Sequence, residues 1–391
     1  MHLVRSPLSA RFADDGVFAP AAPTGAIHPR ATPALGLTSD GASISPRATV
    51  EVHGGGGAPL AVSAAFSLYL PGGATPLATS ITASGSGVAG DTLTLAPPPF
   101  AVTVPAELWS VPRPFLYTLV ASLYDGSLAL LDVVNVTLGV RSVAFAEGSG
   151  ASLNGQPLKL RGFCNHASFT AVGMGVPPRI NLLRMQQMRG MGSNSWRMSH
   201  NPGSPATFAL GDRLGMTFLD ENRVFNSDPS SVTNMGDMVR RDRSHASILW
   251  WSYCNEAGCS PQLEPAASFY AITQQVDGTR PQTMNYFAGD ILPNPQGSVS
   301  VVDVQGLSHP SAANAESMHA AFPKKPLAAT ECCSCLNQRD EDEDQALPPN
   351  STVTYRSNTG GCQASQTNVS TSRDWMAGQC ECAGTGRGPF A

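Results

Sequence analysis

The chain has 391 residues, enough for two domains, and 42% of them are hydrophobic, which excludes wholesale disorder. A net charge of −5 without a long basic run excludes nucleic acid and anionic membrane surfaces as expected partners. No apolar stretch approaches the roughly 20 residues that a membrane helix needs, and the start of the chain lacks the apolar core of a secretory signal.

The first part of the chain has the pattern of β-strands. Residues 1–30 do not complete a domain by themselves, whereas residues 31–147 contain partly alternating apolar runs separated by proline and glycine clusters. Phe115–Tyr124 and Leu128–Leu138 flank Asp125-Gly126, which is a hairpin turn signal. Because no helical periodicity competes, we predict a β-sandwich of about a hundred residues here.

Residues 148–391 alternate between strand and helix patterns. Strands are expected at residues 158–163, 193–198, 216–219, 248–253, 282–286, 299–307 and 326–330. Helices are expected at residues 178–189, 205–214, 235–243, 266–276 and 312–322. The turn after the first strand lacks the glycine-rich phosphate fingerprint of a Rossmann sheet, so the seven or so β/α steps favour a parallel barrel.

Polar residues gather just after the expected strands, where barrels carry their functional groups. They are Asn165, His166, His200, Asn201, Asp220, Glu221, Asn222, Asn255, Glu256 and Glu331. Glu256 and Glu331 each follow a strongly apolar strand, the fourth and the seventh. On opposite walls of a barrel mouth and about 5 Å apart, two carboxylates would support a retaining glycosidase mechanism. Spacing alone leaves open that both are acids on surface loops.

Nine cysteines, an odd number, leave at least one without a partner in the chain. Cys332-x-x-Cys335 has no second matching pair at zinc-finger spacing, so we predict no metal site. Disulfides remain open, and Cys254 and Cys259 are either bridged or inert. Sequons at Asn135, Asn350 and Asn368 leave a secretory or lysosome-like origin open, and the compartment and oligomeric state are not determined.

Seven segments resemble glycoside hydrolase family 2, the β-galactosidase/β-glucuronidase family, in the family's order. They are Leu108–Tyr117, Leu138–Arg141, Leu153–Gly162, Asn194–Pro202, Leu214–Asn222, Arg240–Glu256 and Lys325–Glu331. The resemblance implies an immunoglobulin-like β-sandwich at residues 31–147, followed by a TIM barrel at residues 148–391. It also implies a carbohydrate substrate, and the mechanism requires no cofactor.

The resemblance assigns roles to the catalytic pair and its neighbours. Glu256 would be the acid/base and Glu331 the nucleophile, while Asn255 would bond the sugar 2-hydroxyl. Arg197 would keep Glu331 ionised, because a fixed cation lowers a carboxylate pKa. The alternative for Arg197 is a buried ion pair with Asp220 or Glu221.

Other residues would line the sugar subsite. His200 and His166 would contact the sugar, and Asn201 and Asp220 would form its wall. Tyr286 ends a strand and is a further candidate, although tyrosine at a strand end is more often packed in the core. His309 follows strand six, where the family often has a tyrosine, and Trp250 and Trp251 are expected in the core.

The chain departs from the family at both ends. Residues 1–30 would be a linker or a remnant of the family's jelly-roll sugar-binding domain. The glycine-rich segment Gln379–Ala391 stands where the eighth strand belongs, so that strand is expected to be degenerate or missing. The function hypothesis is a retaining β-glycosidase, with β-galactoside favoured over β-glucuronide or β-mannoside. The alternatives are a truncated, catalytically impaired or non-catalytic carbohydrate-binding relative, or a structural adhesin.

Overall fold

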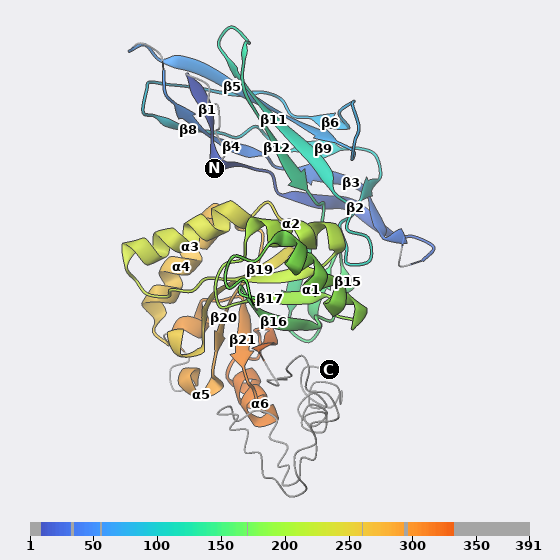
Figure 1. Ribbon diagram of the computed structural model, residues 1–391, viewed down its shortest axis with the longest axis vertical. Coiled ribbons are helices and arrows are strands. Elements are labelled where there is room, and N and C mark those ends of the chain that lie inside the picture. The colour runs from blue at the N-terminus through green and yellow to red at the C-terminus, as the bar shows by residue number, and fades with distance from the viewer. Residues whose placement is uncertain are drawn as a thin grey trace, which may run out of the picture.

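The structure is a computed structural model that describes residues 9–331 except 33–34, 55–56, 170, 260 and 293–295. Figure 1 shows antiparallel sheets of the first part of the chain stacked on one end of a body of parallel strands and helices. Within the described residues the fold is a sandwich-like set of antiparallel sheets followed by an incomplete TIM barrel, which confirms the predicted fold class.

Three antiparallel sheets make up the first part. The first sheet contains, in spatial order, β1 (Ala10–Phe18), β4 (Arg47–Val52) and β8 (Thr92–Leu95). The second contains β10 (Ala106–Glu107), β3 (Leu37–Ile44) and β2 (Ala21–Pro29), with β9 (Phe100–Val102) beside β3. The third contains β12 (Leu130–Leu138), β11 (Tyr117–Asp125), β5 (Leu60–Tyr69) and β6 (Ala78–Thr79), with β7 (Ala83–Gly87) beside β5. The predicted hairpin at Asp125-Gly126 joins β11 to β12. Every second residue of β5 and β11 is buried in one apolar core.

Residues 10–29 are part of this sandwich. Strand β1 pairs antiparallel with β4, and β2 pairs antiparallel with β3. Phe12 and Val17 of β1 are buried in the common core. Strand pairing therefore joins residues 10–29 to the sheets that follow. Their apolar side chains are buried in the same core as those of the later strands, which favours this pairing.

Seven parallel strands follow in chain order, each paired with the next. They are β16 (Gly162–His166), β17 (Ser195–Ser199), β18 (Thr217–Glu221), β19 (Ile248–Asn255), β20 (Gln282–Tyr286), β21 (Val304–Ser308) and β22 (Leu327–Glu331). The first was predicted at Leu158–Phe163, but Leu158 and Leu160 instead pack beneath the barrel against the apolar cluster of Trp109 and Trp250. The predicted degenerate eighth strand lies outside the described residues.

Helices connect the strands and cover their outer face. They are α1 (Pro178–Gly190), α2 (Pro205–Leu214), α3 (Pro229–Asp242), α4 (Leu263–Val276), α5 (Ala288–Ile291) and α6 (Ala312–Ala321), with short 3₁₀ turns η2 (Glu256–Gly258) and η3 (Ser298–Ser300). Proline occupies the first turn of α1, α2 and α3, where its missing N–H costs nothing. No helix among the described residues is long and apolar enough to cross a bilayer.

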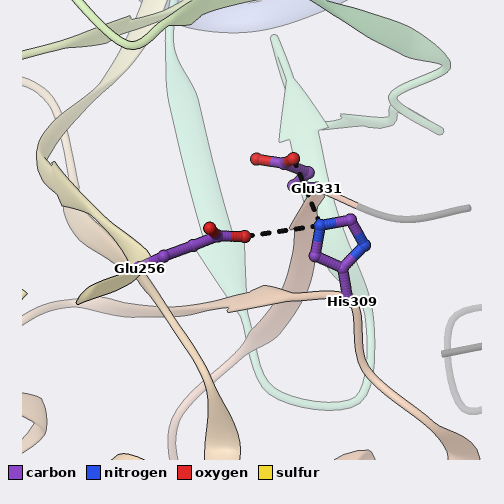
Figure 2. A group of neighbouring side chains, drawn as sticks. All are labelled: Glu256, His309 and Glu331. Carbon is purple, nitrogen blue, oxygen red and sulfur yellow. Dashed lines mark ion pairs between the residues drawn. The ribbon is translucent and has the colours of Figure 1, made fainter. Parts of the chain in front are cut away.

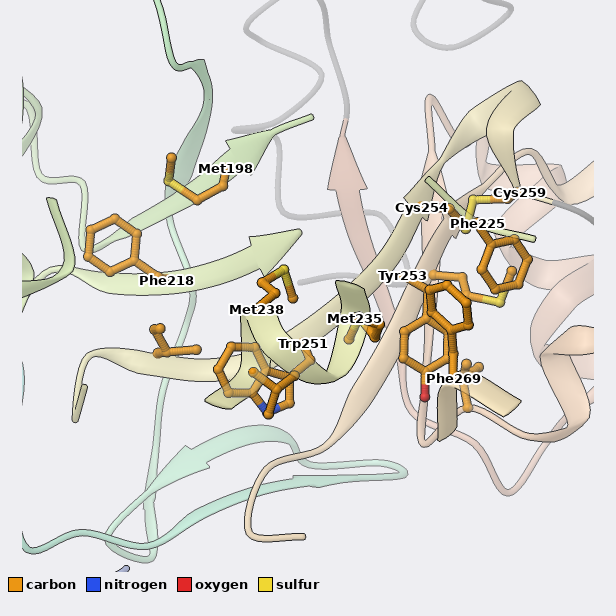
Figure 3. Packing of buried hydrophobic residues seen from close by; sticks show 14 of the residues in the cluster. Met198, Phe218, Phe225, Met235, Met238, Trp251, Tyr253, Cys254, Cys259 and Phe269 are labelled. Carbon is orange, nitrogen blue, oxygen red and sulfur yellow. A yellow bond between two sulfur atoms is a disulfide. The ribbon is translucent and has the colours of Figure 1, made fainter. Parts of the chain in front are cut away.

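Strands β17 to β21 are buried on both faces, so alternate residues enter different environments. One set, including Met198, Phe218 and Tyr253, packs against the helices, as Figure 3 shows. The other set points to the barrel axis. This division decides which polar side chains can reach the mouth of the barrel.

A small sheet of β13 (Val143–Ala146), β14 (Gly150–Leu153) and β15 (Gln156–Pro157) connects the two parts. Contacts across the junction reach the beginning of the barrel strands. The indole N–H of Trp109 donates to the carbonyl of Asp212 at 2.8 Å, and the guanidinium of Arg141 donates to the carbonyl of Ile248 at 2.6 Å. Because Ile248 begins β19, the sandwich is fixed to the amino ends of the strands, away from the mouth.

Gly215 at the end of α2 is expected to be the glycine most sensitive to substitution at this junction. Its φ is +69°, and an added Cβ would lie 2.2 Å from the carbonyl oxygen of Val111. Gly215→Ala should therefore lower the free energy of unfolding by about 2–5 kcal/mol, through left-handed strain and a backbone clash. Urea denaturation followed by circular dichroism would measure the loss.

Gly192→Ala is the matched control, because Gly192 has φ +86° but no atom within 4 Å of an added Cβ. It should lower the free energy of unfolding by only about 1–2 kcal/mol. Equal losses in the two variants would contradict the contact between α2 and the Val111 segment as a source of stability.

Candidate active site

Glu256 and Glu331 lie at the carboxyl ends of β19 and β22, at the same edge of the sheet. Glu256 is the first residue of η2 and has φ +46°. A disulfide joins Cys254 to Cys259 across this turn, so the two cysteines are bridged and not inert. Cys254 is the last strand residue that faces the helix side, and the bridge ties the chain on both sides of Glu256 to that packed layer.

His309 lies between the two carboxylates, as Figure 2 shows. Its Nε2 is 3.3 Å from Oε1 of Glu256 and 3.2 Å from Oε1 of Glu331. One carboxylate oxygen of each glutamate and this nitrogen all lie within 4.8 Å of one another. The hydroxyl of Ser308 also donates to Glu256. The two carboxylates predicted as a pair are therefore brought face to face at the mouth.

Arg197 links this pair to the wall of the barrel. Its guanidinium donates to Oε2 of Glu331 at 2.7 Å and forms a two-pronged ion pair with Glu221 at 2.7–2.9 Å. Arg197 therefore contacts both Glu331 and the buried Glu221, so the two predicted partners are not exclusive. Burial alone would lower the pKa of Arg197, but the carboxylates of Glu221 and Glu331 raise it.

Hydrogen bonds fix the side chain of Asn255 beside Glu256. Its Oδ1 accepts from the guanidinium of Arg197 at 2.7 Å and from the amide of Asn285. Asn285 in turn accepts a hydrogen bond from the hydroxyl of Thr330. With its carbonyl oxygen engaged by two donors, Asn255 has its amide group to offer to another molecule.

Two histidines form the wall next to Arg197. The ring of His200 lies 3.2 Å from Arg197 and 3.0 Å from Glu221, and the ring of His166 meets it edge to face with centroids 5.2 Å apart. His166 keeps part of its surface in solvent. Partial desolvation of its ring, followed by the charge of the nearby His200, lowers its pKa. Asn201 is half-buried directly after His200. His166, His200 and Asn201 thus lie at or just beyond the carboxyl ends of β16 and β17, beside Arg197.

Residues 146–305 match the family model described as the TIM barrel domain of family 2 glycosyl hydrolases. The matched residues include β16 to β20 and Glu256. The barrel of this chain matches glycoside hydrolase family 2. This confirms the resemblance inferred from the seven segments.

Family 2 relatives carry two names for their activity. The β-galactosidase BoGH2A of Bacteroides ovatus is 31% identical over 38% of this chain and 19% of its own length. A β-glucuronidase of Paenibacillus borealis is 29% identical over 39% of this chain and 28% of its own length. A family 2 crystal structure from Bacteroides cellulosilyticus covers 82% of this chain and 40% of its own, with 22% identity and a TM-score of 0.68. The chain thus spans less than half the length of these proteins.

Two of the predicted site residues face away from the mouth of this family 2 barrel. Asp220 is fully buried on the helix side of β18, where it accepts from the backbone N–H of Gly203 at 3.3 Å. Burial, followed by the charge of the neighbouring Asp242, raises its pKa well above the ordinary value. Tyr286 is fully buried in the apolar cluster between strands and helices. Asp220 and Tyr286 were predicted to contact the sugar, but neither side chain lies at the mouth, because strand residues alternate between the two faces.

The residues on the inner face at those positions are Glu221 and Asn285, each one step along the same strand. The sequence signal that could have found them is this two-residue period. Arg197 and Asn285 each lie next to large apolar residues of the helix-facing set, and Glu221 lies three residues after Phe218 of that set. His309 and Ser308 gave no comparable signal, because their contacts with Glu256 depend on how β21 and the turn after β19 approach each other.

The ionisation of Glu331 should make the stability of the chain sensitive to acid. Burial would raise the pKa of Glu331, but hydrogen bonds from His309 and Arg197 lower it from 4.5 to about 2. A carboxyl whose pKa is depressed on folding stabilises the protein above its unfolded pKa, and this contribution disappears as pH falls from about 4.5 towards 2. When the pH is lowered from 6 to 2.5, the free energy of unfolding of the parent should therefore fall further than that of Glu331→Gln, by about 2–3 kcal/mol.

Urea denaturation at stepped pH would test this acid dependence. Glu316→Gln, on the exposed face of α6, is the matched control and should follow the parent curve. Parallel curves for the parent and Glu331→Gln would show that Glu331 is not held ionised in the folded chain.

Proposed function

We propose that this chain is a retaining β-glycosidase that uses Glu331 as nucleophile and Glu256 as acid/base. The observation that carries the proposal is the approach of one oxygen of each carboxylate to within 4.8 Å at the barrel mouth. Retaining enzymes hold their two carboxyl groups about 5–5.5 Å apart, whereas inverting enzymes need room for a water molecule between them. The short separation supports double displacement.

In the first step Glu331 attacks the anomeric carbon while Glu256 protonates the departing glycosidic oxygen. The glycosyl–Glu331 ester then forms and the aglycone leaves as an alcohol. In the second step Glu256, now a carboxylate, removes a proton from water as the water displaces Glu331. Glu331 must be ionised at the start, which the depressed pKa near 2 supports.

Neighbouring side chains suit a sugar ring at this position. The amide of Asn255 would donate to the 2-hydroxyl, an interaction that strengthens in the transition state. His200, His166 and Asn201 would contact the other hydroxyls from the opposite wall. Each step needs only carboxylates, water and these hydrogen-bonding groups.

We favour a β-galactoside as substrate over a β-glucuronide. A glucuronide would need a cation for its carboxylate at the mouth. Arg197 is committed to Glu221 and Glu331, and Lys325 donates to the carbonyls of Ser300 and Val299, far from the mouth at the amino end of β22. The β-galactosidase name of the Bacteroides ovatus relative points the same way.

Hydrolysis of p-nitrophenyl β-galactoside, β-glucuronide and β-mannoside by the purified chain tests the proposal. Turnover of the galactoside should exceed that of the other two, vanish in Glu331→Gln and persist in Glu316→Gln. Preference for the glucuronide would overturn the substrate but keep the mechanism. No turnover from a folded chain that still binds galactose would instead support a non-catalytic carbohydrate-binding protein.

A further inference from the structure

We propose that Glu256, His309 and Glu331 form a site for a transition-metal dication of the Zn²⁺ class, and that the bound ion blocks the active site. The binding itself rests only on the geometry of these three side chains. The block rests on the proposed glycosidase function.

The three ligand atoms already have the spacing of a tetrahedral metal site. Zinc binds imidazole nitrogen and carboxylate oxygen at about 2.0–2.2 Å, so two ligands of one tetrahedron lie about 3.3 Å apart. Nε2 of His309 is 3.3 Å and 3.2 Å from its two carboxylate oxygens. The oxygens themselves lie within 4.8 Å of each other. Rotation of the Glu256 side chain, which is 25% exposed, can close that remaining distance.

Oε2 of Glu331 already accepts a hydrogen bond from Arg197, which leaves Oε1, the oxygen beside His309, to bind the ion. Arg197 donates to Oε2 of Glu331, while Oε1 faces His309. The backbone N–H of His309 donates to the carbonyl of Glu331 at 2.7 Å. The imidazole ring stacks on the ring of Phe287, with the two ring centroids 6.4 Å apart. Its side chain is only 6% exposed, so the imidazole is rigid and needs little reorganisation to bind.

Charge and ligand type select the kind of ion. Arg197 is balanced by Glu221, so Glu256 and Glu331 together present about two uncompensated negative charges when both are ionised. A dication would neutralise them. Calcium and magnesium prefer six or more oxygen ligands, whereas one imidazole and two carboxylates with an open fourth position suit zinc.

An ion at this position is incompatible with the proposed reaction. Its bond to Glu331 occupies the lone pair that would attack the anomeric carbon, and its bond to Glu256 excludes the proton that the leaving oxygen needs. Binding uses the lone pairs of the imidazole and of the two carboxylates, so a bound ion leaves none of them free for the reaction. The expected behaviour is inhibition that competes with substrate and is reversed by a chelator.

Titration calorimetry of the purified chain with Zn²⁺ tests the site without reference to activity. His309→Phe, which keeps the ring stacked on Phe287, should weaken binding by more than about 100-fold, since loss of even an outer partner costs about 10–100-fold. Glu331→Gln should weaken it similarly while keeping an acceptor for Arg197. His319→Gln removes an exposed histidine of α6 and should bind as the parent does. Visible spectra of bound Co²⁺ should report a four-coordinate ion in the parent and not in His309→Phe.

The proposed site would be overturned if His309→Phe bound Zn²⁺ as tightly as the parent does. It would also be overturned if His319→Gln lost as much Zn²⁺ affinity as His309→Phe. Binding that follows the predicted variants but leaves glycoside hydrolysis unaffected would overturn the block alone. If the chain hydrolyses no glycoside, calorimetry and Co²⁺ spectra still decide whether the ion binds, so failure of the proposed function is distinguishable from failure of this inference.

Discussion

Glu256→Ala is expected to slow hydrolysis of phenyl β-galactoside by about 10²–10⁴-fold and to affect the 2,4-dinitrophenyl glycoside far less. A phenol is a poor leaving group that needs the proton of Glu256, whereas dinitrophenolate leaves without it. Added azide should rescue turnover of the dinitrophenyl substrate, because an anion can displace Glu331 without a general base. Stopped assays on both substrates, with and without azide, measure these effects.

Glu331→Gln provides the contrast, because loss of the nucleophile should lower kcat by about 10⁴-fold or more for both leaving groups. Azide should not rescue it with retention of configuration. Glu316→Gln is the matched surface control. If Glu256→Ala slowed hydrolysis of the phenyl and the dinitrophenyl glycosides by the same factor, the role of Glu256 as acid would be contradicted.

Arg197→Met is expected to lower the free energy of unfolding by about 3–5 kcal/mol, the usual cost of leaving a buried carboxylate without its partner. Glu221 is fully buried, and besides Arg197 its oxygens contact only His200 and the hydroxyl of Ser252 among the described residues. The same substitution removes the cation that lowers the pKa of Glu331. Chemical denaturation at pH 7 would measure the loss.

Two further variants identify the cause of that loss. Arg189→Met, at the exposed end of α1, should change stability by less than about 0.5 kcal/mol. Adding Glu221→Gln to Arg197→Met should restore part of the stability, because the buried charge is then gone. If Arg197→Met alone costs under about 1 kcal/mol, the ion pair with Glu221 is not a major determinant of the fold.

The sequence was most informative where local patterns are decisive. Alternating runs around Asp125-Gly126 predicted the hairpin, and apolar runs followed by polar residues predicted the strands that end at Glu256 and Glu331. Element boundaries were less certain: β16 lies four residues beyond its predicted start, because Leu158 and Leu160 serve the junction with the sandwich. Residues 10–29 gave no clear signal because their core partners lie on other strands.

The sequence by itself therefore determined the two-part architecture, the family and the strand ends on which the carboxylates lie. Only the tertiary structure decided which face of each strand looks into the mouth, so that Glu221 and Asn285 point inward while Asp220 and Tyr286 point to the helices. It also decided the disulfide between Cys254 and Cys259 and the position of His309 between two glutamates. The reason is that strand periodicity is local, whereas the approach of side chains on different strands depends on how the whole sheet curves towards closure.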